Sequence, residues 1–209
     1  MLIAMIYKIF LGYLAVGVGL AGYSFYLRSI FKGRTKPHAF SWLLWGILTG
    51  IVFVAQLVKG GGSGSWATGM SSVVCFSIGF IGLKKDTRGF SRFDWVFLGA
   101  AVVALLCWFF TKQPTFSIML VTTVDVLGYA STLRKGYRYP HEENVASFSM
   151  QSLKYVVSIT ALQSYSLVTW LYPAAMIVMN SAVAILVAAR QYQEPRSTMI
   201  SSVASDAIS

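Results

Sequence analysis

Residues 9–31 read IFLGYLAVGVGLAGYSFYLRSIF, an apolar run that is long enough to cross a lipid bilayer. A helix rises about 1.5 Å per residue, so roughly 20 apolar residues span the hydrocarbon core. Six further runs of this kind follow, over residues 40–58, 65–83, 93–111, 115–134, 145–164 and 166–190. The sequence therefore predicts an all-α integral membrane protein with seven transmembrane helices.

The composition agrees with this prediction. Hydrophobic residues make up 56% of the 209 residues and charged residues only 11%, whereas a soluble domain carries about 25% charged residues. Seven spans leave only short connections, so no loop can hold a separate catalytic domain. Cys75 and Cys107 both fall inside apolar runs, without metal-ligand spacing, and indicate neither a disulfide framework nor a metal cofactor.

The basic residues predict the orientation. Thirteen of the 17 Lys and Arg residues lie in the odd-numbered connections or the C-terminal tail, while the N-terminus and the even-numbered connections hold only Lys8, Lys59 and Lys112. By the positive-inside rule, the N-terminus is outside and the C-terminus is cytoplasmic. The net charge of +10 then reflects this asymmetry, and we expect no nucleic-acid partner. Residues 191–209, which are polar and Ser-rich, predict a disordered cytoplasmic tail.

Two similar stretches lie in the first and second halves of the chain. The first contains, in order, Gly22-Tyr23, Leu27-Arg28, Pro37-His38 and Ser41, and the second contains Gly128-Tyr129, Leu133-Arg134, Pro140-His141 and Ser147. This order predicts two parallel three-helix repeats, residues 9–84 and 115–190, joined by a linker helix at 93–111 and related by an axis along the membrane normal. The alternative is a chance match between basic turns that contain proline.

Two ionisable residues lie deep inside the predicted spans, where such residues are costly and mark functional sites. Asp125 is nine residues from Arg134, and Lys154 is ten residues from Asn144, so each lies roughly 14–15 Å into the membrane. Asn180 lies at a similar depth. We expect these three side chains to bind a substrate at the midplane, and Asp125 to carry the proton if transport is coupled. The alternative is an Asp125–Lys154 ion pair that only locks two helices together.

The first repeat contributes smaller, uncharged groups at the same predicted depth. They are Thr49, Ser71, Ser72 and Cys75. Together with the charged second repeat, Thr49, Ser72 and Cys75 complete the expected substrate site. A sugar, an amino acid, a vitamin precursor or a nucleoside fits these side chains equally well, so the sequence leaves the substrate open.

The 3+1+3 layout, with an outside N-terminus and short basic turns that contain proline, resembles the SWEET, SemiSWEET and PQ-loop superfamily over residues 9–190. Where that superfamily has a Pro-Gln pair, this chain has Pro37-His38 and Pro140-His141. The resemblance implies substrate binding at the midplane, with Asn180 in the position of an asparagine that binds substrate. It also implies proton coupling through an acidic membrane residue, here Asp125, as in certain lysosomal PQ-loop transporters.

The leading functional hypothesis is a small-molecule transporter that works by alternating access around the midplane site, driven by the substrate gradient or by protons. The second is a receptor or sensor on the same scaffold. We do not expect an enzyme, because the chain has no HExxH or GxSxG motif and no carboxylate pair at depth. The expected partners are a small-molecule substrate, the lipid bilayer and, as an open alternative, further copies of the chain. The compact loops favour a bacterial inner membrane.

Overall fold

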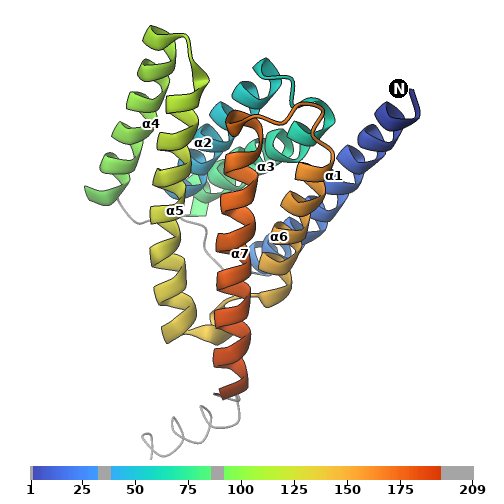
Figure 1. Ribbon diagram of the computed structural model, residues 1–209. Coiled ribbons are helices and arrows are strands. Elements are labelled where there is room, and N and C mark those ends of the chain that lie inside the picture. The colour runs from blue at the N-terminus through green and yellow to red at the C-terminus, as the bar shows by residue number, and fades with distance from the viewer. Residues whose placement is uncertain (1, 33–38, 86–91, 194–209) are drawn as a thin grey trace, which may run out of the picture.

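The computed structural model describes residues 2–32, 39–85 and 92–193, and the regular structure in these ranges is helical throughout (Figure 1). The elements are α1 (Leu2–Phe31), α2 (Ala39–Val58), the 3₁₀ helix η1 (Gly62–Ser65), α3 (Trp66–Lys85), α4 (Arg92–Thr111), α5 (Pro114–Arg138), the 3₁₀ helix η2 (Pro140–Glu142), α6 (Val145–Thr160) and α7 (Leu167–Gln193). The prediction of an all-α chain is confirmed over these residues.

Five stretches of the described chain are long and apolar enough to cross a membrane. They are Met5–Phe31, Ala39–Val58, Gly62–Lys84, Pro114–Arg138 and Leu167–Gln193. The sequence predicts seven spans, and α4 and α6 are not among these five. The predicted span 145–164 is shorter in the structure, because α6 has 16 residues and rises only about 24 Å. The last helix, α7, continues to Gln193, past the expected end at Arg190. The rest of the predicted tail lies outside the described residues.

Charged side chains are buried in this bundle, while many large apolar side chains are exposed on its outside. Lys154, Asp125 and Asn180 are buried, with exposed fractions of 1%, 4% and 3%. Large apolar side chains cover the outside, among them Phe110 at 74% and Ile185 at 70% exposure. An apolar exterior of this extent requires an apolar surrounding, and polar residues in a membrane face the interior of the protein. These are the features of an integral membrane protein.

The third helix of each half lies between the other two. α3 packs against both α1 and α2, and α7 packs against both α5 and α6. Between the halves, α1 packs along α6, and α2 contacts α5. α4 lies beside α5 at one edge of the bundle, as Figure 1 shows. Residues from both halves therefore face a common interior.

A row of small residues on α1 allows its close contact with α3 and α6. Gly12, Ala15, Gly19 and Gly22 recur every three or four residues and so share one face of the helix. A Cβ atom on Gly12 would lie 2.8 Å from the Cβ of Ser63, and one on Gly22 would lie 3.0 Å from the Cβ of Met150. Small residues bring helix backbones together in membranes, and here they bring α1 against side chains of both halves.

At the end of the bundle where α1 begins, residues 60–65 and 161–164 form a contact that we call the glycine interlock. The Gln163 N–H donates to the Gly61 carbonyl over 3.1 Å. The Ser63 hydroxyl donates to the carbonyls of Ala161 and of Lys8 in α1. A Cβ on Gly64 would lie only 2.6 Å from the Leu162 nitrogen. Both halves of the chain are therefore tied together at this end.

Candidate functional site

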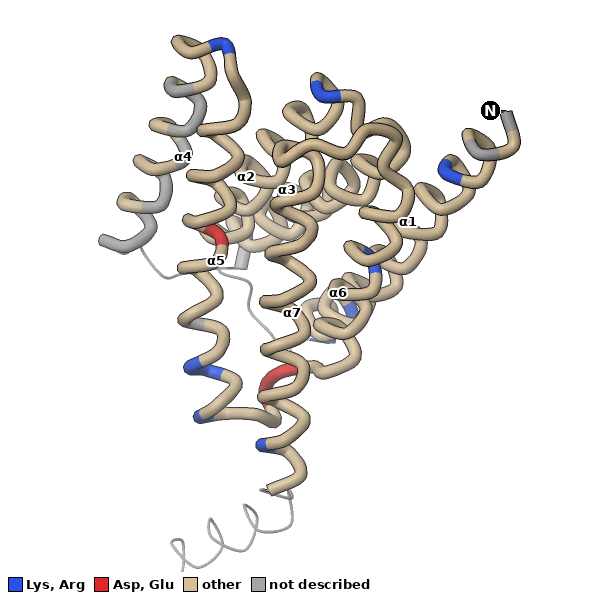
Figure 2. The backbone as a smooth tube through the Cα atoms, in the orientation of Figure 1, with Lys and Arg blue, Asp and Glu red and all other residues tan. Residues whose placement is uncertain are grey.

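Polar side chains from both halves of the chain meet inside the bundle. We call them the central polar cluster, which consists of Tyr23 in α1, Ser71 and Cys75 in α3, Asp125 in α5, Gln151, Lys154 and Tyr155 in α6, and Tyr172 and Asn180 in α7. Figure 2 shows that most Lys and Arg residues lie toward the ends of the helices. A charged group inside the bundle is therefore an exception among the charged residues of this chain. In membrane proteins such a buried charge marks a functional site.

Lys154 is the buried cation of the cluster. Its Nζ donates to the Ser71 hydroxyl over 2.8 Å and to the Gln151 side-chain oxygen over 2.6 Å. The same ammonium group lies 4.1 Å from the centre of the Tyr155 ring and 5.3 Å from that of Tyr23. Cation–π contacts of this kind attract a cation without neutralising it. All four of these partners are neutral.

The stem of Lys154 lies against α1 at Gly19. A Cβ on Gly19 would lie 2.6 Å from the Lys154 Cδ and would also collide with the Met70 methyl group. A glycine at this position therefore gives the lysine side chain the space to cross from α6 toward Ser71 in α3.

Asp125 is the buried anion of the cluster, and it has a different set of partners. Its Oδ2 accepts a hydrogen bond of 2.7 Å from the Tyr172 hydroxyl, and the Trp45 side chain of α2 also interacts with it. Within the described chain, Asp125 and Lys154 do not form an ion pair. The two charges therefore do not lock their helices together directly, unlike in the ion-pair alternative.

Two tyrosines lie between the opposite charges. The rings of Tyr155 and Tyr172 meet edge to face, with their centres 5.9 Å apart at an angle of 82°. Tyr155 also contacts the Lys154 ammonium group, and Tyr172 also binds Asp125. A continuous series of contacts thus joins the cation to the anion across α6, α7 and α5. Aromatic pairs in this geometry are favourable by about 0.5–1.5 kcal/mol beyond their buried area.

The remaining predicted site residues fall into two groups. Asn180 is buried, donates to the Met176 carbonyl over 2.8 Å and interacts with Tyr129 of α5. Cys75 faces the Tyr23 hydroxyl at 3.9 Å and so joins the cluster. Thr49 and Ser72 instead bind the backbone of α2. The Thr49 hydroxyl donates to the Trp45 carbonyl over 2.6 Å, and the Ser72 hydroxyl donates to the Gly46 carbonyl over 2.7 Å. In this conformation, these two hydroxyls are used in helix packing.

Four aromatic residues in this region were not predicted from the sequence. Tyr23, Tyr155 and Tyr172 contact the charged groups directly, and Trp45 interacts with Asp125. Aromatic residues in a membrane protein are common both in the interior and at the interfaces. Of these four, only Tyr155 had a local signal in the sequence, because it directly follows Lys154.

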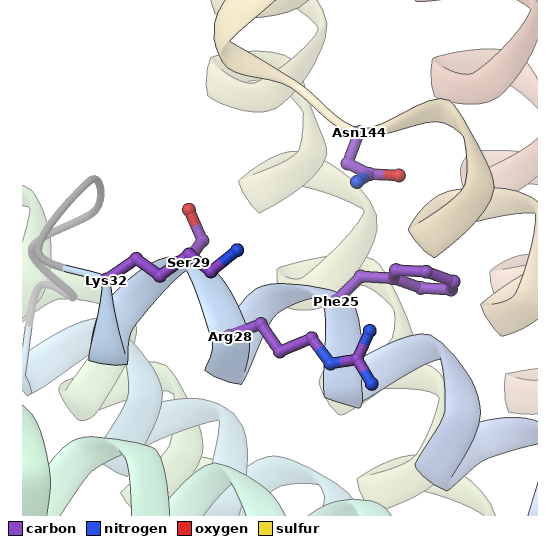
Figure 3. A pocket seen from close by; sticks show the side chains of 5 residues that line it. All are labelled: Phe25, Arg28, Ser29, Lys32 and Asn144. Atoms are coloured by element: carbon purple, nitrogen blue, oxygen red, sulfur yellow. The ribbon is translucent and has the colours of Figure 1, made fainter.

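A separate pocket of about 180 Å³ lies where α1 ends and α6 begins. Phe25, Arg28, Ser29 and Lys32 of α1 line it together with Asn144, which caps α6 by accepting a hydrogen bond from the Ser147 N–H (Figure 3). Asn144 lies directly before α6, whereas residues 161–164 of the glycine interlock directly follow its last residue, Thr160. The pocket is therefore at the opposite end of the bundle from the glycine interlock.

Comparison with known proteins adds no relative. No family model, curated protein or solved structure matches this chain. In the residues that the structure describes, no three His, Cys, Asp or Glu side chains are grouped as a metal site would require. The function is therefore inferred from the central polar cluster and the packing around it.

Proposed function

We propose that this protein is a small-molecule membrane transporter that works by alternating access around the central polar cluster. The observation that carries the proposal is the origin of the cluster in both halves of the chain. Lys154 from the second half is held by Ser71 and Tyr23 from the first. Relative movement of the halves would therefore open or close the surroundings of a buried charge, as alternating access requires.

The packing of the helices supports two parallel repeats. In each half the third helix lies between the first and the second. The same pairs of helices also meet between the halves, because α1 contacts α6 and α2 contacts α5, and α3 contacts α6 and α7 contacts α2; the α1–α6 contact is much more extensive than the α2–α5 contact. Exchanging the halves reproduces this pattern, as a two-fold axis would. We therefore propose seven spans in the 3+1+3 layout of the SWEET and PQ-loop superfamily. From the basic residues we also propose a cytoplasmic C-terminus, and from the compact loops a bacterial inner membrane.

The two ends of the bundle differ in a way that supports a closed and an open side. The glycine interlock joins the halves at the end where α1 begins. At the other end, α1 and the start of α6 border the 180 Å³ pocket. An alternating-access transporter that is closed at one end and has a cavity at the other shows this asymmetry. Transport would then require the interlock to separate.

Labelling of Cys75 tests the proposal without knowledge of the substrate. The chain has two cysteines, so Cys107→Ser leaves Cys75 as the single thiol, inside the cluster. A membrane-impermeant methanethiosulfonate reagent is added to one side of oriented vesicles and then, in a separate experiment, to the other. We expect Cys75 to react from both sides, with mass spectrometry of the intact protein as the readout and Cys75→Ser as the control.

Each other result has a defined meaning. Reaction from one side only would favour the receptor or sensor alternative, in which a pocket opens to a single face. No reaction from either side, in a protein that is folded by size-exclusion chromatography, would contradict alternating access and assign the cluster to structural packing.

A further inference from the structure

Among the residues that the structure describes, Lys154 has no negatively charged partner. Its exposed fraction is 1%, and no carboxylate of these residues lies within 4.0 Å of its Nζ. A buried charge in a membrane protein normally pairs with an opposite charge or with backbone carbonyls. An ammonium group has three N–H donors. Ser71 and Gln151 accept two of them, and the ring of Tyr155 lies 4.1 Å away. The missing component is an anion.

A second unused donor lies beside this ammonium group. The Gln151 side chain accepts from Lys154 through its oxygen, while its Nε2 is buried and has no hydrogen-bond partner within the described chain. The residue as a whole is 9% exposed. Its Nε2 faces Gly22 of α1, because a Cβ there would lie 3.0 Å from it. Buried donors that lack partners are unusual and costly, so this amide N–H is a donor that a bound acceptor would satisfy.

Together, the Lys154 ammonium group and the Gln151 amide supply the N–H donors that a carboxylate needs. We propose that Lys154, Gln151 and Ser71 bind the carboxylate of a small-molecule substrate, which supplies the counter-ion of the lysine. One carboxylate oxygen would accept from the Lys154 ammonium group and the other from the Gln151 Nε2. This inference rests on the transporter function proposed above and narrows its substrate to a carboxylate-bearing metabolite. Neutral sugars and nucleosides are excluded.

The opposite charge, Asp125, is positioned to serve a different part of the substrate or a proton. The tyrosine pair separates it from Lys154, and its Oδ2 is bound by Tyr172. An amino acid would bring an ammonium group toward Asp125, while a simple carboxylate would leave that position to a proton. Both kinds of compound carry the carboxylate that Lys154 would bind, and only the amino acid also carries an ammonium group.

Protection of Cys75 from labelling provides the measurement, since Cys75 faces Tyr23 beside the lysine. The probes are the common L-amino acids, and lactate, pyruvate, succinate and nicotinate as carboxylates without an ammonium group. Lactamide and nicotinamide are the neutral amides of two of these carboxylates and serve as matched controls. Glucose and uridine are further neutral compounds. Alaninamide keeps the ammonium group of an amino acid but lacks the carboxylate. A thermal-shift measurement with the same probes gives an independent reading of binding.

We expect at least one carboxylate to slow labelling and raise the melting temperature, and its amide counterpart to do neither. Lys154→Met should weaken that protection at least about tenfold, since a hydrogen bond to a charged group is lost. Lys154→Arg should retain part of it. Gln151→Leu, which leaves the lysine in place, should also weaken it. Lys59→Met, which removes an exposed lysine outside the cluster, should have no effect.

Three results would overturn the carboxylate proposal. They are protection by neutral compounds alone, protection by a carboxylate that survives Lys154→Met, and no protection by any probe although Cys75 reacts from both sides. The last result would leave the transporter function intact. If Cys75 reacts from neither side, the transporter function fails, while a carboxylate-specific thermal shift that Lys154→Met removes would still establish the site. Protection by amino acids but not by simple carboxylates would assign the ammonium group to Asp125.

Discussion

Gln56 of α2 supplies the hydrogen bond that Pro173 of α7 cannot form. Proline has no N–H, so inside a helix it leaves the carbonyl four residues earlier without its usual donor. In α7 that carbonyl belongs to Thr169, and the Gln56 Nε2 donates to it over 2.8 Å. Gln56, Thr169 and Pro173 are all buried. A backbone carbonyl that lacks its helical donor in one half of the chain thus accepts a hydrogen bond from a side chain of the other half. In the interior of a membrane protein every backbone polar group needs such a partner.

The first prediction tests this pair by a double-mutant cycle. Gln56→Leu leaves the Thr169 carbonyl unpaired and should lower the free energy of unfolding by about 1 kcal/mol, the scale of interhelical hydrogen bonds in membranes. In a Pro173→Ala background, the alanine restores a backbone N–H that donates to the same carbonyl, so the loss should be smaller. Unfolding in mixed detergent micelles measures both. Equal losses in the two backgrounds would show that Gln56 does not act through this carbonyl.

The second prediction concerns the glycine interlock. Gly64→Ala places a Cβ 2.6 Å from the Leu162 nitrogen and 2.7 Å from its Cα, and these backbone atoms cannot turn aside. We expect a lower melting temperature and faster labelling of Cys75 from the side of the membrane where α1 begins. Gly17→Ala is the matched control, because a Cβ at Gly17 meets nothing within 4 Å. Unchanged labelling from that side in Gly64→Ala would contradict a gating role for the interlock.

The third prediction assigns the pH dependence to Asp125. Asp125→Asn is uncharged and so mimics the protonated acid at every pH. If protonation permits the conformational change, the rate of that change in the wild type falls as pH rises. In the variant, the rate stays near the value that the wild type has at acidic pH. The rate of Cys75 labelling reports this change. The thiolate fraction of Cys75 rises with pH in both proteins, so the ratio of variant to wild-type rates should increase with pH. A constant ratio would remove Asp125 from proton coupling.

The fourth prediction concerns the hydroxyl that holds this carboxyl group. Tyr172→Phe removes the 2.7 Å hydrogen bond to Asp125 and leaves a buried polar group without its main donor. The cost should be about 1–3 kcal/mol of unfolding free energy. It should be smaller in an Asp125→Asn background, since a neutral amide needs the donor less. Tyr13→Phe, which removes a hydroxyl from a side chain that is 66% exposed, is the control and should change little.

Several features of the site were predictable from the sequence alone. Asp125, Lys154 and Asn180 were expected inside the bundle because a polar side chain in an apolar run has nowhere else to go at low cost. All three are buried. The spacing along the chain also placed them at a similar depth, because the rise of a helix is fixed. The ends of the helices were less predictable, and α6 stops at Thr160 rather than at residue 164.

The partners of these residues were not predictable. Nothing in the spacing of Lys154 and Asp125 indicates that they bind Ser71 and Tyr172 rather than each other. Thr49 and Ser72 are buried, yet their hydroxyls bind the α2 backbone. Depth depends on the number of residues, whereas contact depends on how each helix is rotated and on which helix lies next to it. Those two variables are set by packing between distant segments.

The order of amino acids is enough to specify that the chain forms apolar helices, and which polar side chains they carry into the interior. The reason is local, because a helix in lipid satisfies its backbone hydrogen bonds within one segment and its side chains follow a fixed period. Packing between the halves establishes that α1 meets α6 through its glycine face, that Gln56 compensates for Pro173, and that Lys154 binds Ser71 rather than Asp125. These relationships join residues at least 83 positions apart, and they exist only once the two halves have packed together.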